Sequence, residues 1–238
     1  LNEAENRIEV SYPIIGDTSG FVDNFQQVVT KAAANWKSLE KKGMLDAYSA
    51  QINDYSERGV LREVSREEVK AYAAEGGVVH YVSHHGVLND HSSSTPLRVV
   101  VNTAMPNNWS GPVPNDMWPK GPNSLNNMFE VLIRFRSYVV AMVFDIAKAY
   151  HALKTGVPEF FMRLLVWRKS DKDEWTTYGH DTVAFGDRPA AIDLELGKAA
   201  TADAGKEIDQ EAAEKLTKDS YVDDGASGGS RESVSRMV

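Results

Sequence analysis

The sequence contains no cysteine, so disulfides, thiolate zinc sites and cysteine nucleophiles are excluded. No apolar run approaches the ~20 residues that a bilayer-spanning helix needs, and residues 1–7 lack the pattern of a signal peptide. The chain also begins without methionine, which suggests a piece cut from a larger protein. We therefore expect a cytoplasmic protein in a reducing compartment, with no membrane partner.

Basic residues are in the minority, because the 238-residue chain has 34 acidic and 26 basic residues and a formal net charge of −8. Binding to a polyanion requires Lys and Arg, so this total argues against a nucleic-acid partner. The distribution is uneven. Residues 80–170 hold nine basic and five acidic residues, whereas residues 171–238 hold eight basic and sixteen acidic ones. The basic middle region leaves a nucleic-acid partner compatible with the charge.

Hydrophobic periodicity predicts helices at 24–42, 45–57, from 65 onward, at 125–136, 188–204 and 207–218, with another beginning near 230. Apolar and β-branched runs predict strands at 78–82, 97–101 and 138–145, and a hairpin formed by 160–168 and 174–178. The polar stretch 84–96 is predicted as a hairpin loop, and 103–124 as an irregular packed connection. Helices and hairpins without a regular βαβ repeat predict the α+β class.

The most informative motif is Tyr221-Val222-Asp223-Asp224, set among turn and strand formers. Adjacent acids on a tight turn repel each other, so a fold that keeps them usually places a cation there. A third acid, Asp145, ends the apolar stretch 138–144. Carboxylates that meet from separate strands suit Mg²⁺ in a phosphoryl-transfer site. The motif alone also fits a solvated turn, because Asp and Gly favour turns for backbone reasons.

Eight stretches, in order and spread over most of the chain, resemble the reverse transcriptase domain of retroelement polyproteins, most closely the BEL/Pao type of long-terminal-repeat retrotransposon. They are HHGV at 84–87, LRVV at 97–100, GPN at 121–123, LIRFR at 132–136, FDIAKAY at 144–150, LVWR at 165–168, TVAFG at 182–186 and YVDD at 221–224.

The resemblance implies a right-hand polymerase with fingers and an antiparallel palm sheet packed on helices, and with the thumb absent. Residues 1–75 would be a helical lead-in, 76–124 the fingers strands and loop, and 125–238 the palm, with fingers elements interleaved at 156–180. The implied function is that of an RNA-directed DNA polymerase fragment in a retroelement particle. Its expected partners are an RNA or DNA template with primer, deoxynucleoside triphosphates, and the thumb, RNase H and integrase of the polyprotein.

The resemblance also implies roles for individual residues. Asp145, the Ile146 backbone and Asp223 would hold two Mg²⁺, with Mn²⁺ as a substitute, and Asp224 would tune the field as the third catalytic acid. The remaining roles are nucleotide binding by Arg98, Ile146, Tyr150, Phe185 and Gly186, and a primer-side position for Tyr221 and Val222. The ring of Tyr150 would exclude a ribose 2′-hydroxyl. Plainer interpretations stay open: Asp145 as a helix cap, Tyr150 and Tyr221 as packing residues, and Arg98 as a surface residue.

Two departures from the family pattern weaken the fingers chemistry. The loop 89–96 ends in Thr95-Pro96 where the family commonly has Lys, and Asp187-Arg188-Pro189 replaces small residues after Gly186. His84 and His85 fit no metal spacing, so we interpret them as loop or hydrogen-bonding residues. The chain alone is expected to extend a primer weakly or not at all.

Two other functions are compatible with the sequence. The first is a retroelement-derived domain kept as a non-catalytic nucleic-acid-binding or scaffold module, which the charge of −8 favours and the intact acids disfavour. The second is an unrelated Mg²⁺-dependent nuclease. It would need a further acid near Asp145, and Asp193 and Glu195 are the candidates, on a predicted helix of the wrong register.

Overall fold

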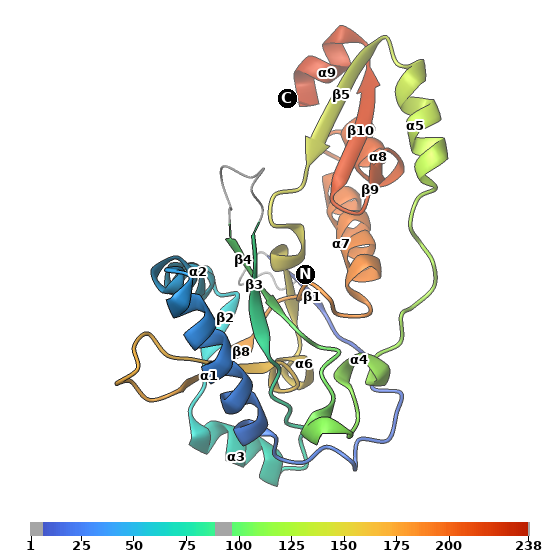
Figure 1. Ribbon diagram of the computed structural model, residues 1–238. Coiled ribbons are helices and arrows are strands. Elements are labelled where there is room, and N and C mark those ends of the chain that lie inside the picture. Colours follow the sequence, from blue (N-terminus) through green and yellow to red (C-terminus); the bar gives the residue numbers. More distant parts are fainter. Residues whose placement is uncertain (1–6, 89–96, 238) are drawn as a thin grey trace. The chain divides into compact units, whose positions relative to one another are not determined.

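A computed structural model describes residues 7–88 and 97–237 and divides the chain into two compact units (Figure 1). The first unit comprises Leu1–Ile8, Lys120–Leu153 and Pro189–Val238, and the second comprises Glu9–Pro119 and Lys154–Arg188. The predicted loop 89–96 lies outside the described residues. Over the part of the chain that is described, no helix is both long and apolar enough to cross a bilayer.

The second unit combines helices with small antiparallel sheets. Strands β2 (Leu61–Glu63), β8 (Thr176–His180) and β7 (Leu164–Trp167) form one sheet in that order, and β3 (His84–Leu88) pairs with β4 (Leu97–Val101) in another. Its helices are α1 (Phe25–Lys41), α2 (Leu45–Glu57), α3 (Arg66–Ala74), α4 (Pro114–Met117) and α6 (Val157–Phe161), with a 3₁₀ turn at Asn107–Trp109. Strands β1 (Ile8–Val10) and β6 (Leu153–Thr155) form a two-stranded sheet.

The core of the second unit is built from the apolar faces of α1 and α2 and from the sheets. Trp36 and Leu39 of α1 and Tyr48 and Ile52 of α2 belong to one buried cluster with Trp167 of β7. Their helical spacing places these side chains on the inner faces of the two helices. The helices predicted at 24–42 and 45–57 are therefore confirmed, and so is the helix after Ser65, whose hydroxyl accepts from the Glu68 N–H at 3.1 Å.

The first unit is one antiparallel sheet with helices against it. The strand order is β5 (Val140–Asp145), β10 (Asp224–Gly229) and β9 (Ser220–Tyr221). The helices are α5 (Met128–Ser137), α7 (Ala190–Gly205), α8 (Gln210–Lys218) and α9 (Arg231–Met237), with a short 3₁₀ helix at Ala149–Ala152. Helices α5, α8 and α9 contact the strands, and α7 packs on α8. The predicted α+β class is confirmed, as are the strand ending at Asp145 and the helices predicted at 188–204 and 207–218.

One predicted strand is wrong, and the first strand of the predicted hairpin of 160–168 and 174–178 is shorter than predicted, although the hairpin itself is confirmed. Residues 78–82 do not form a strand: they run extended beside α6 and β7, with backbone bonds such as Val82 N–H to Leu164 O at 2.6 Å and a single bridge at Tyr81. The strand of the hairpin instead begins at His84, within the stretch predicted as loop. Residues 160–168 are not one strand either, because α6 ends at Phe161 and only Leu164–Trp167 pair with β8. Pro158 in the first turn fixes a helical φ there and begins that helix.

His84 is a buried strand residue rather than a loop residue, and it is hydrogen-bonded as expected. Its Nε2 lies 2.9 Å from the Val166 carbonyl oxygen, and its Nδ1 lies 2.6 Å from the Tyr48 hydroxyl. Because a carbonyl can only accept, Nε2 carries the proton and Nδ1 accepts from Tyr48. A second proton on Nδ1 would require the Tyr48 hydroxyl to accept instead of donate.

This burial predicts a loss of stability in acid. Burial lowers the pKa of His80 and of His84 to about 4, from the 6.5 of a free imidazole. Between pH 6.5 and about pH 4, the two histidines are therefore protonated in the unfolded chain but not in the folded chain. Their contribution to the free energy of unfolding should be complete above pH 6.5 and decline as the pH falls toward 4. Thermal unfolding between about pH 7 and pH 5 should show this decline.

Imidazole NMR titration isolates the histidines from the carboxylates that also titrate in acid. In the folded chain the His80 and His84 ring protons should not shift until the pH is well below 6.5, and in urea they should titrate normally. A normal titration in the folded state would contradict the neutral, buried assignment.

Candidate active site

The sheet of the first unit brings the predicted acids to one end of two paired strands. In the antiparallel register of β5 and β10, Asp224 lies opposite Asp145. One residue further along β5, the Ile146 N–H donates to the Asp223 carbonyl oxygen at 2.9 Å. Paired residues in such a ladder have Cα atoms about 4.5–5.5 Å apart. Three acids from two distant parts of the sequence therefore share one end of the sheet, whose strands β5, β10 and β9 are labelled in Figure 1.

The glycine after the two acids is required by this pairing. Gly225 lies opposite Phe144, and a Cβ at Gly225 would lie 2.1 Å from the Phe144 ring. Only a residue without a side chain lets β10 approach β5 under that ring. The Asp-Asp-Gly run therefore does more here than form a solvated turn.

Asp223 lies at the tip of a tight β-hairpin, and Asp224 begins the second strand of that hairpin. Asp224 pairs with Tyr221 across the hairpin of β9 and β10, which leaves Val222 and Asp223 at its tip. Val222 has a φ of 56°, in the left-handed region that β-branched residues avoid. Tight hairpins favour a positive φ at the first tip residue, because it matches the twist of the strands. The strain costs about 1–3 kcal/mol and persists only where other contacts impose it.

Lys198 of α7 supplies such contacts. Its side chain is buried, and its ammonium donates to the Val222 carbonyl oxygen and to the Ser220 hydroxyl, both at 2.8 Å. Glu195, one turn earlier on the helix, pairs with the same ammonium at 2.8 Å. The lysine therefore fixes the peptide immediately before Asp223.

Asp219 anchors the base of the same hairpin. This carboxylate is buried and accepts from the Tyr138 hydroxyl at 2.7 Å, the Ser227 hydroxyl at 2.7 Å and Arg134 Nε at 3.0 Å. Desolvation, the largest single effect, raises its pKa, but the hydrogen bonds from Ser227, Tyr138 and Arg134 together exceed it and lower the pKa. Asp219 is therefore an ionised structural acid.

Tyr150 lies on the short 3₁₀ helix Ala149–Ala152, which follows β5. Its ring is half-buried, and its pKa is raised first by burial and then by the negative charges of Asp223 and Glu195. Of the predicted nucleotide-site residues, Ile146 and Tyr150 are thus in the same unit as the acids.

A groove of about 540 Å³ runs along this end of the sheet. Asp145, Asp224 and Tyr221 line it together with apolar side chains of α5 and β5, namely Met128, Val131, Val143 and Phe144. Asp145 and Asp224 are exposed, so their carboxylates are accessible to solvent.

The donor atoms at this end of the sheet are oxygens of carboxylates and backbone carbonyls, the ligands that Mg²⁺ prefers. Asp145, Asp223 and the Ile146 carbonyl fit such an ion by their chemistry. Across the described residues, however, no three His, Asp or Glu side chains converge closely enough to hold a metal by themselves.

The other predicted nucleotide-site residues belong to the second unit. Arg98 is exposed on β4, opposite Val87. Gly186 has a φ of 103°, and its carbonyl oxygen accepts from the Thr103 hydroxyl at 3.1 Å, so the Phe185-Gly186 turn lies just beyond the end of β4. A positive φ is the conformation for which glycine is suited.

Asp187, which we noted as a departure from the family pattern, has a structural role. It is fully buried and pairs with the buried Arg163 at 2.5 Å, while its carboxylate also accepts from the Ala184 N–H at 3.1 Å. This pair closes the turn that carries Gly186. Sequence reasoning missed the structural roles of Asp187, Lys198 and Asp219, because side chains that hold them come from distant parts of the sequence.

Comparison with known proteins supports the fold. No protein-family model matches the chain, and no curated protein matches it in sequence. A solved structure of a foamy viral protease–reverse transcriptase in complex with double-stranded DNA is similar, with a TM-score of 0.51 and 15% sequence identity. The match covers 86% of this chain and 27% of that one. The chain therefore has a reverse-transcriptase-like fold and spans about a quarter of its structural relative.

Proposed function

We propose that this chain is the fingers–palm part of a retroelement reverse transcriptase of the BEL/Pao type, which adds deoxynucleotides to a primer. One observation carries the proposal: β5 and the hairpin of β9 and β10 bring Asp145, Asp223 and Asp224 to one end of a sheet. The similar fold of a reverse transcriptase supports it.

Asp145, Asp223 and the Ile146 carbonyl would hold Mg²⁺ at this end of the sheet. Bound there, Mg²⁺ would acidify the primer 3′-hydroxyl and neutralise charge on the triphosphate. The chain itself positions the reactants. The apolar groove beside Asp145 and Asp224 offers a surface for the sugar and base of a primer nucleotide. In the second unit, Arg98 offers a planar guanidinium for phosphate oxygens.

Primer extension tests the proposal. The purified chain is incubated with a labelled primer on RNA and on DNA templates, with deoxynucleotides and Mg²⁺ or Mn²⁺. We expect templated, metal-dependent addition that is slow, because the match covers only 27% of the structural relative. Template binding without any addition, also at high enzyme concentration, would favour the non-catalytic binding module instead.

Tyr150 gives a second test, because its ring would lie beneath the sugar of the incoming nucleotide. Tyr150→Val is expected to raise the incorporation of ribonucleotides relative to deoxyribonucleotides about 10- to 100-fold, since a steric exclusion is removed. Competing ribo- and deoxynucleotides in single-nucleotide addition measure this ratio. Tyr150→Phe keeps the ring and serves as the control. An unchanged ratio in an active Tyr150→Val protein would make Tyr150 a packing residue.

A further inference from the structure

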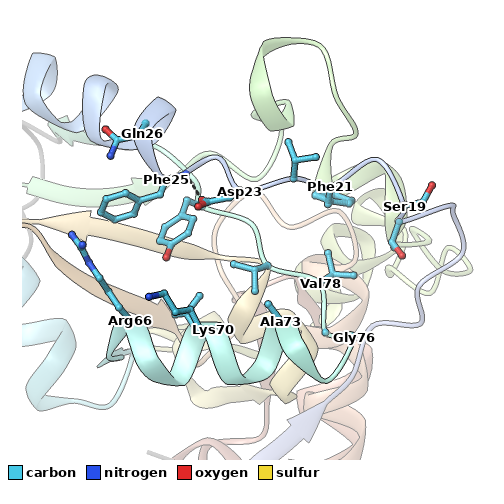
Figure 2. A pocket seen from close by; sticks show the side chains of 16 residues that line it. Ser19, Phe21, Asp23, Phe25, Gln26, Arg66, Lys70, Ala73, Gly76 and Val78 are labelled. Atoms are coloured by element: carbon cyan, nitrogen blue, oxygen red, sulfur yellow. Dashed lines mark hydrogen bonds between the residues drawn. The ribbon is translucent and has the colours of Figure 1, made fainter.

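The second unit contains a cavity of about 710 Å³ that none of the roles above uses. One wall is the N-terminal segment that leads into α1, with Ser19, Phe21, Val22, Asp23 and Phe25. The opposite wall is the exposed face of α3 and the residues after it, from Arg66 to Val79 (Figure 2). This volume is in the range of about 300–1,000 Å³ that is usual for small-molecule sites.

The walls are fixed by polar contacts beneath the cavity. The Asn24 side chain donates to the Tyr81 carbonyl oxygen at 2.8 Å and accepts from the Tyr81 N–H at 2.9 Å. Asn24 is buried, so these two bonds tie the N-terminal segment to the floor of the cavity. Ser19 is held by Asp17 through two bonds of 2.9 Å. A cavity with fixed walls loses little entropy when a ligand binds.

Two cations line one side of the cavity. Arg66 and Lys70 stand one helical turn apart on α3 and both line the cavity, and Figure 2 shows Arg66 extending toward Phe25. The Arg66 guanidinium lies 5.0 Å from the centre of the Phe25 ring, a cation–π contact that orients it. Among the described residues, no carboxylate pairs with Arg66 or Lys70 within 4.0 Å.

The opposite side is aromatic with one acceptor. Phe25 packs edge-on against Tyr81 with ring centroids 5.3 Å apart, and Phe21 packs in the same way against His80 at 5.4 Å. Asp23 is exposed, and one of its carboxylate oxygens accepts from the Phe25 N–H at 2.9 Å. The cavity thus presents cations, flat apolar surface and a hydrogen-bond acceptor together.

We infer that this cavity binds a nucleoside phosphate unit, either free or within a single strand of nucleic acid. Arg66 and Lys70 take the phosphate oxygens, the Phe21 and Phe25 wall takes the flat base, and Asp23 accepts from an amino or sugar hydroxyl group. A simple anion would use the cations alone and would not need the aromatic wall. The site is independent of Asp145 and Asp223, which belong to the other unit.

Binding is measured with the whole chain, by fluorescence anisotropy of a labelled single-stranded oligonucleotide and by NMR shifts with a free nucleoside monophosphate. Arg66→Gln and Lys70→Gln are each expected to weaken binding about 2- to 5-fold, as for exposed ion pairs. Each should also make the slope of log binding constant against log salt concentration shallower by about 0.7. Asp23→Ala should weaken binding of the nucleoside monophosphate, because it removes the acceptor for the amino or hydroxyl group. Lys37→Gln, an exposed lysine of α1 outside the cavity, is the control.

The two ligands identify the source of the phosphate unit. Cavity-dependent binding of the oligonucleotide alone supports a strand site, and binding of both ligands supports a nucleotide site. The oligonucleotide and nucleotide titrations are repeated with the double variant Asp145→Asn/Asp223→Asn, whose cavity should bind both ligands as the unchanged chain does. A failure of the polymerase proposal would therefore not affect the result for the cavity. The inference is overturned if Arg66→Gln/Lys70→Gln binds like the Lys37→Gln control. It is also overturned if a polyglutamate peptide competes as well as the oligonucleotide, because the cavity would then be only an anion site.

Discussion

Asp145→Asn and Asp223→Asn are each expected to lower nucleotide addition at least about 10³-fold, while the fold stays intact. Asparagine keeps the size of the side chain and removes the charge that would hold a divalent cation. The same variants should therefore weaken Mn²⁺ binding at least about 10-fold, as loss of a metal ligand does. Electron paramagnetic resonance of free Mn²⁺ measures this without depending on catalysis.

Two other aspartates provide matched controls. Asp224 is exposed and lies opposite Asp145, so its charge would act on a metal held there. Asp224→Asn should therefore lower nucleotide addition and Mn²⁺ binding less than Asp145→Asn or Asp223→Asn does. Asp203 is on α7, where it pairs with Lys206 at 2.6 Å, and Asp203→Asn should leave both readouts unchanged. Unchanged Mn²⁺ binding in Asp145→Asn and Asp223→Asn would refute the assignment of these acids as metal ligands.

The sequence predicts the long elements of this fold well, because their signals are local. Helices α1 and α2 each place apolar residues on one face, and Gly43 ends the first of them with a φ of 67°. The strand β5 was recognisable from the apolar run that ends at Asp145. In each case the neighbours in sequence determine most of the outcome.

The short elements were predicted less well, because distant partners decide them. The β-branched run at 78–82 has strand propensity, but its partners are Phe161 and Leu164, at the end of a helix and the start of a strand. It therefore makes scattered bonds rather than a ladder. The polar His84 looked like a loop residue until Tyr48 and Val166 gave both ring nitrogens a partner. Strand propensity depends on such context.

The same distinction applies to the candidate site. Asp145, Asp223 and Asp224 could be found because adjacent acids beside strand formers are unusual in themselves. The residues that hold the hairpin could not be found this way. Lys198 lies 22 residues from Ser220, and nothing local indicates that an ammonium on α7 would bind there. Supporting contacts of this kind become visible only in three dimensions.

Lys198→Met is expected to impair both the stability of the first unit and the chemistry at Asp223. Methionine fills the space of the lysine stem but cannot donate to Val222 or Ser220. It also leaves Glu195, whose side chain is only 10% exposed, without its partner. Breaking a buried pair in this way costs about 3–5 kcal/mol, which thermal or urea unfolding should detect. Nucleotide addition and Mn²⁺ affinity should fall about 10- to 100-fold, as for outer-shell residues that orient ligands.

The double variant Lys198→Met/Glu195→Gln separates the two effects. Neutralising Glu195 removes the unpaired buried charge, so most of the lost stability should return. The carbonyl of Val222 would still lack its donor, and the strained tip with φ at 56° would remain unclamped. Mn²⁺ affinity and nucleotide addition should therefore stay low in the double variant, with the loss in kcat larger than the change in KM for the deoxynucleotide. If stability and Mn²⁺ affinity returned together, Lys198 would be only half of a structural ion pair, and the left-handed Val222 would need another explanation.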